Sequence, residues 1–139
     1  MSTSIQTQHP SRLASILQSY NELPSWVKIW INFILGPINL ATLAFLNQPS
    51  GGLIAALSLS GMLFTVAIVF VVGGFKKIAA AGHILPWTPL VLMLAFARPE
   101  GSAVYQAFLS ALLVANTISL AFDYNDLRVL AKSKADASV

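Results

Sequence analysis

WVKIWINFILGPINLATLAFL, residues 26–46, is the stretch that decides the fold. It is apolar along its length except for one lysine, two asparagines, one threonine and a Gly-Pro step. At a rise of about 1.5 Å per residue, a helix of this length crosses the roughly 30 Å hydrocarbon core of a bilayer. The stretch therefore predicts a membrane-spanning helix that carries Asn32 and Asn39 at membrane depth.

The composition of the whole chain also indicates a membrane protein. Of its 139 residues, 56% are hydrophobic and only 9% are charged, and the mean hydropathy is +0.73. So few charges cannot cover the surface of a soluble domain. The net charge of +3 comes from basic residues beside apolar stretches, so we expect the bilayer as partner and no nucleic acid. The chain has no cysteine, which excludes disulfides and thiolate metal sites.

The apolar stretches predict an all-α integral membrane bundle of four transmembrane helices. We expect the spans at about residues 26–46, 52–72, 78–97 and 102–122. The third span is set by length, because the run from Pro86 to Ala97 covers only about 18 Å. A third span that starts near Ile78 is long enough to cross the bilayer. It then contains His83, with Pro86 and Pro89 as kinks. A broken or partly re-entrant segment is the alternative.

Polar segments flank these spans at both ends of the chain. Residues 1–25 are predicted to form a polar tail and a short amphipathic helix on the membrane surface, with a disordered tail as the alternative. The apolar face of that helix is formed by Leu13, Ile16, Leu17 and Tyr20. Residues 123–139 are predicted to form a cytoplasmic tail, in which Leu127 and Leu130 prolong the helix before disorder begins at Lys132.

The basic residues predict the orientation. With four spans, Arg98 is the single one of the eight Lys and Arg residues on its side of the membrane. The others share the opposite side: Arg12, Lys28, Lys76, Lys77, Arg128, Lys132 and Lys134. Positive residues favour the cytoplasmic side, so we expect both termini in the cytoplasm and the protein in a cell inner membrane. With three spans, these seven basic residues would be divided between the two sides of the membrane.

Polar groups at membrane depth are the candidates for a functional site. Asn32 and Asn39 are seven residues apart, almost two helical turns, and therefore share a stripe that should face protein. The fourth span offers Asn116 at the depth of Asn32, so we expect these two to meet. The candidates for a pore lining or a helix contact are Asn32, Gly36, Pro37, Asn39, Asn116 and Ser119.

Charged groups near the inner membrane edge form a second candidate. The predicted inner-mouth cluster consists of Lys28, Lys76, Lys77, Asp123 and Asp126. Aspartates near a helix C-terminus call for a nearby cation, and depth favours Lys28 beside Asp123. The cluster is either an entry site for cations or protons, or an anchoring set of salt bridges. His83 is a possible proton relay, with a structural or interfacial role as the alternative.

Motifs for catalysis, phosphate binding and metal ligation are missing from the sequence, so we expect neither an enzyme nor a cofactor or metal. The pattern from Trp26-Val27-x-x-Trp30 to Gly36-Pro37-x-Asn39, together with Asp123-Tyr124-Asn125-Asp126, is similar to small uncharacterised bacterial inner-membrane proteins of four spans. This resemblance carries no named family, no activity and no site residue.

These features support two hypotheses of function. The first is a homo-oligomeric channel or transporter for a small ion or solute, because four short helices rarely enclose a pathway alone. The alternative is a non-catalytic accessory or assembly subunit that binds a larger membrane complex, with the asparagines holding the helices together.

Overall fold

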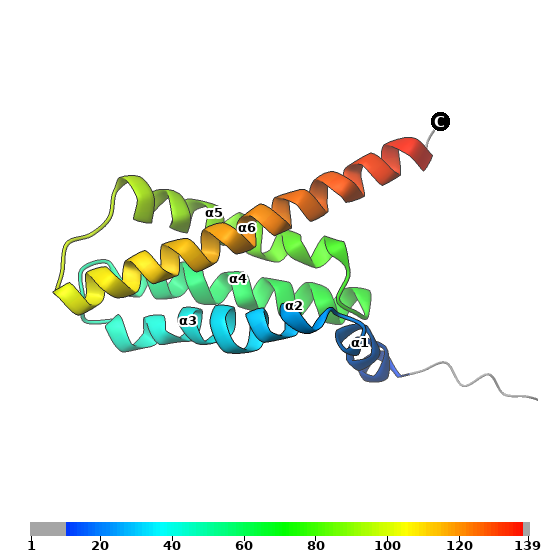
Figure 1. Ribbon diagram of the computed structural model, residues 1–139, viewed down its shortest axis with the longest axis horizontal. Helices are drawn as coiled ribbons and strands as arrows, with labels where there is room; N and C mark the ends of the chain where they lie inside the picture. Colours follow the sequence, from blue (N-terminus) through cyan, green and yellow to red (C-terminus); the bar gives the residue numbers. More distant parts are fainter. Residues whose placement is uncertain (1–10, 138–139) are drawn as a thin grey trace, which may run out of the picture.

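A computed structural model describes residues 11–137 of the chain, which form helices and no strands (Figure 1). Four helical stretches are long and apolar enough to cross a membrane. They are Ser25–Phe45, Gly51–Val72, Lys77–Phe96 and Ala103–Ala137. The predicted all-α fold with four spans is therefore confirmed, and the four apolar helices indicate a multi-pass membrane protein.

Helix α1, Arg12–Asn21, precedes the first span and packs against the bundle. Its N-terminus is capped by Ser11, whose hydroxyl accepts a hydrogen bond from the Ala14 amide at 3.2 Å. Ile16 is buried with Val69 of the second span. A helix therefore forms in the predicted segment, its position on a membrane surface stays a prediction, and residues 1–10 of the predicted polar tail lie outside the described residues.

The first span changes its helical type along its length. It consists of α2 (Ser25–Ile29), the π-helix η1 (Trp30–Leu35), α3 (Gly36–Leu40) and the 3₁₀-helix η2 (Ala41–Phe45). Pro37 has no amide proton, and its ring would collide with a carbonyl one α-helical turn earlier. The π-helix widens the backbone just before this proline, and the Gly36 amide donates to the Ile31 carbonyl. The helix distortion before Gly36-Pro37 thus takes the form of a π-helix.

The second and third spans are joined at a glycine. Helix α4, Gly51–Val72, ends at Gly73, which has the left-handed φ of 78° that glycine tolerates. The 3₁₀-helix η3 (Lys77–Ala80) comes next and leads into α5 (Ala81–Phe96). Helix α5 continues through Pro86 and Pro89, so the third span begins next to the predicted Ile78 and is not broken.

Close packing between α4 and α5 depends on two glycines. A Cβ atom at Gly61 would lie 2.2 Å from the indole nitrogen of Trp87, which is fully buried. A Cβ atom at Gly82 would lie 2.4 Å from the backbone nitrogen of Thr65. Both distances are far below van der Waals contact, so these two helices approach closely only because the glycines lack side chains.

Helix α6 (Ala103–Ala137) is much longer than a single span requires. Its 35 residues extend about 52 Å at 1.5 Å per residue, and its end projects past the other helices (Figure 1). The disorder predicted from Lys132 onward is wrong for residues 132–137, which are helical. The physical reason is that residues 103–137 contain no glycine or proline to end the helix. Residues 138–139 lie outside the described residues.

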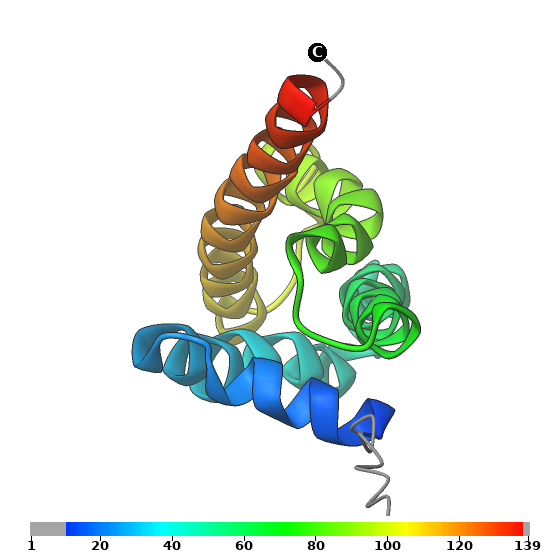
Figure 2. The ribbon, with the colours of Figure 1, turned by 90° about the vertical axis from the view of Figure 1, so that its right-hand side faces the viewer.

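The four spans lie around a common centre when the bundle is viewed along its length (Figure 2). Successive spans are neighbours, and the first span also contacts α6. At one end the Tyr105 hydroxyl donates to the Pro49 carbonyl at 2.8 Å and joins the start of α6 to the turn between the first two spans. The opposite end, called the basic end below, carries Arg12, Lys28, Lys76, Lys77, Arg128, Lys132 and Lys134.

Candidate functional site

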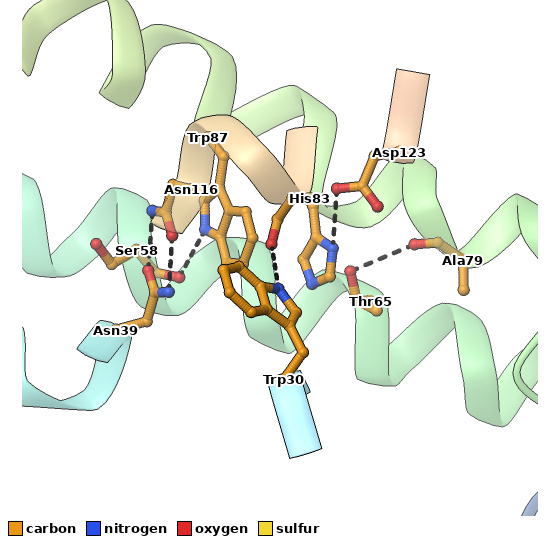
Figure 3. A network of polar contacts seen from close by, with 10 residues as sticks. Trp30, Asn39, Ser58, Thr65, Ala79, His83, Trp87, Asn116 and Asp123 are labelled. Atoms are coloured by element: carbon orange, nitrogen blue, oxygen red, sulfur yellow. Dashed lines mark hydrogen bonds and ion pairs between the residues drawn. The ribbon is translucent and has the colours of Figure 1, made fainter. Parts of the chain in front are cut away.

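Polar side chains from all four spans form a network inside the bundle (Figure 3). The fully or almost fully buried members are Asn39, Thr42, Ser58, Asn116 and Ser119. Each comes from a face that its helix turns toward the bundle interior. The network therefore runs through the protein and not along its lipid-facing surface.

The centre of this network is a reciprocal pair of amides. Asn39 Nδ2 donates to Asn116 Oδ1 at 2.9 Å, and Asn116 Nδ2 donates to Asn39 Oδ1 at 3.1 Å. Asn39 Nδ2 also donates to the Leu35 carbonyl at 2.9 Å. Both asparagines have no exposed surface. The pair joins the first span to α6 by two hydrogen bonds that satisfy both side chains.

The predicted partner of Asn116 is corrected by this pair. Asn32 is exposed and donates to the Tyr20 hydroxyl and, at 2.8 Å, to the Lys28 carbonyl. A seven-residue stripe holds for an α-helix, but a π-helix places an extra residue in each turn and rotates the residues that come after it. The π-helix between the asparagines thus turns Asn32 out of the interior while Asn39 faces Asn116.

A second link between the same two helices is made by Trp30. Its indole N–H donates to the Ser119 hydroxyl at 3.0 Å, and Ser119 is 5% exposed. Of the six residues predicted for a pore lining or helix contact, Asn39, Asn116 and Ser119 therefore lie together in the interior. Gly36 is half-buried within the distorted helix and Pro37 is exposed.

An ionisable pair joins α5 to α6. His83 Nδ1 lies 3.2 Å from Asp123 Oδ2, and the two side chains are 17% and 14% exposed. The imidazole stacks on the indole of Trp87 with ring centroids 4.1 Å apart. The Trp87 N–H in turn donates to the Ser58 carbonyl at 3.0 Å. The position of His83 is thus fixed by an aromatic ring that is itself hydrogen-bonded to α4 (Figure 3).

The remaining charges of the predicted inner-mouth cluster are arranged differently from the prediction. Lys77 and Asp126 form a salt bridge at 3.0 Å. The expected contact of Lys28 with Asp123 is wrong. Lys28 Nζ instead donates to the Asn21 carbonyl at 2.9 Å, because α1 folds back beside the start of the first span. Asp123 contacts His83 instead.

Two ion pairs therefore connect the third span to α6, about one helical turn apart. In Lys77–Asp126 the side chains are 51% and 37% exposed, so water screens the charges. His83–Asp123 is shielded, and neither His83 Nδ1 nor Asp123 Oδ2 makes a well-aligned hydrogen bond within residues 11–137. Both atoms can bind a proton. Within the same residues no three His, Asp or Glu side chains gather closely enough to hold a metal ion.

Sequence reasoning missed the two tryptophan contacts and the partner of His83. A usable signal existed for the partner, since His83 and Asp123 both lie near the same membrane edge by depth. No comparable signal existed for Trp87, whose place depends on Gly61 of another helix. No protein-family model, curated protein or solved structure matches this chain.

Proposed function

We propose that the chain is a proton-conducting or proton-coupled transport protein of a cell inner membrane, with both termini cytoplasmic and with His83 and Asp123 as its proton-binding site. The observation that supports this proposal is the shielded contact of two ionisable side chains between two membrane-spanning helices. Ionisable groups at membrane depth are costly, and in membrane proteins they mark ion and proton pathways. Histidine changes its charge between pH 5 and 8, which suits reversible proton binding.

The position of the pair supports an entry from the basic end. His83–Asp123 lies one turn deeper than the exposed Lys77–Asp126 pair on the same helix. Both side chains keep a small exposed fraction, 17% for His83 and 14% for Asp123. The excess of basic residues at the same end favours the cytoplasm, so the pair would exchange protons with that compartment.

The interior of a single copy offers no continuation of this route, which supports a homo-oligomer. The Asn39–Asn116 pair and the bulky side chains of Trp30 and Trp87 fill the centre of the bundle. Two open grooves lie at the two ends of the bundle, one beside α1 and one beside Arg98. We therefore place the outer half of the route between copies of the chain.

A second candidate function is favoured by the amide pair. Asn39 and Asn116 hydrogen-bond each other in both directions, as expected of groups that hold helices together and not of groups that bind a passing solute. On that basis the chain would be an accessory or assembly subunit of a larger membrane complex. Purification in mild detergent distinguishes the candidates: a self-oligomer supports transport, and stoichiometric co-purifying membrane proteins support the accessory role.

Proton flux into liposomes tests the transport proposal directly. Full-length protein is reconstituted into vesicles that enclose a pH-sensitive dye, and a pH step between 5 and 8 is applied. We expect the wild type to collapse the gradient faster than empty vesicles and His83→Gln to lose this activity. The control is the double variant Asn39→Leu/Asn116→Leu, which should retain it. Wild-type flux equal to that of empty vesicles over the whole pH range would contradict the proposal.

A further inference from the structure

A polar groove lies where α1 crosses the end of α4, apart from the His83–Asp123 pair. It has a volume of about 620 Å³ and is lined by residues of α1, by Val72 and by the turn after it. Its charged members are Arg12, Glu22 and Lys76.

The groove lies at the depth of lipid headgroups. Helix α4 has 22 residues and spans about 33 Å, which matches the hydrocarbon core, so its last residue reaches the edge of that core. The groove is formed at and beyond this residue. On α1 the side chains of Leu13 and Leu17 are more than half exposed, as in helices that lie in the membrane interface with an apolar face toward the acyl chains.

Within the described part of the chain, the two cationic side chains of the groove, Arg12 and Lys76, have free N–H donors. Arg12 donates to the carbonyls of Phe70 and Val71 at 3.0 and 3.3 Å, and both bonds use Nη1. Within residues 11–137 its Nε and Nη2 donors have no partner, and neither has the Lys76 ammonium. The guanidinium also offsets the negative end of α4, which would otherwise repel an anion.

From this geometry we infer that the groove binds the phosphate of an anionic phospholipid between Arg12 and Lys76. The free edge of a guanidinium is shaped to accept two phosphate oxygens, and lysine adds a point charge. A lipid, in contrast to free phosphate, also places its acyl chains beside the exposed leucines of α1. Glu22 opposes the anion, although Gln18 Nε2 holds its carboxylate by a 3.3 Å hydrogen bond.

The test uses full-length protein in detergent, titrated with dioctanoyl phosphatidylglycerol and followed by microscale thermophoresis. We expect saturable binding, at least tenfold weaker binding of dioctanoyl phosphatidylcholine, and no displacement by equimolar inorganic phosphate. Lys76→Gln should weaken binding about fivefold, the effect of one lysine near a lipid headgroup. Glu22→Gln should tighten it. Neither side chain fixes α1 in place, so both variants should fold.

Lys132→Gln is the matched control, because it removes one charge from an exposed part of α6 at the same end of the bundle but outside the groove. Its affinity should equal that of the wild type. Equal weakening by Lys76→Gln and Lys132→Gln would show diffuse charge attraction and overturn the site. Full competition by inorganic phosphate would overturn the lipid as its ligand, and equal binding of the zwitterionic lipid would overturn charge recognition.

Discussion

Two polar pairs join α6 to its neighbours, and they differ in what they can do. Asn39 and Asn116 are fully buried, uncharged and mutually hydrogen-bonded. His83 and Asp123 are mostly buried but keep some exposed surface, and both side chains can gain or lose a proton. Neutral amides do not bind or release protons under ordinary conditions, whereas a carboxylate and an imidazole are both proton-binding groups. The same bundle thus contains one pair suited to hold helices together and one suited to change its charge.

The largest predicted effect comes from a substitution beside Trp87, whose ring lies next to His83. Gly61→Ala would place a methyl group 2.2 Å from the indole nitrogen of Trp87, the ring on which His83 stacks. We expect the free energy of unfolding to fall by about 3 kcal/mol, as for overpacked cores. Chemical unfolding in detergent measures it. The control is Gly52→Ala, which meets no atom within 4 Å and should cost nothing. Equal stability of the two variants would contradict this packing.

The next effect concerns the amide pair. Asn39→Leu leaves Asn116 buried without its partner and should lower the free energy of unfolding by about 2 kcal/mol. Asn39→Leu/Asn116→Leu removes both polar groups and should regain most of that loss. Asn32→Leu alters an exposed asparagine and should lower the free energy of unfolding by less than Asn39→Leu does. A double variant less stable than the single one would show that the amides do more than satisfy each other.

A smaller change in stability is expected at the ionisable pair. Asp123→Asn removes one charge and leaves an imidazole that can stay neutral, so no isolated charge remains buried. We expect the free energy of unfolding to change by less than about 1 kcal/mol, in line with polar contacts between membrane helices. The measurement is the same unfolding assay. A loss as large as that of Asn39→Leu would make this pair a structural contact like the first.

The smallest effect is expected at the exposed salt bridge. Lys77→Gln breaks the contact with Asp126, where the two side chains are 51% and 37% exposed. Such pairs contribute about 0.5 kcal/mol or less. Unfolding at low and high salt measures the contribution, which should vanish at high salt. A salt-independent loss would show that the pair is more shielded than its exposure indicates.

Much of the fold can be predicted from the sequence because span length and loop chemistry are local. Hydrophobic length placed all four spans, and the length argument correctly began the third helix near Ile78 with His83 inside it. The tail of α6 was predicted less well. Disorder was inferred from its polarity, while an uninterrupted run of helix-forming residues decides its conformation as far as Ala137.

The sequence singled out the residues of the two polar pairs but did not predict which residues contact each other. The sequence placed asparagines facing each other and a carboxylate that needs a cation, yet it paired Asn32 with Asn116 and Lys28 with Asp123. The first error comes from assuming a regular helix from Trp26 to Leu46, and the second from leaving out α1, whose Asn21 carbonyl binds the Lys28 ammonium. The π-helix at Trp30–Leu35 rotates the chain before Asn39, and periodicity alone gives no sign of it.

The central claim is that His83–Asp123, and not the other polar contacts of α6, is the proton-binding site. The most direct test compares proton flux through Asp123→Asn and Asp126→Asn in the same liposomes. The two variants make the same chemical change one helical turn apart. We predict that Asp123→Asn falls to the rate of empty vesicles while Asp126→Asn keeps the wild-type rate. Equal rates in the two variants would contradict the account.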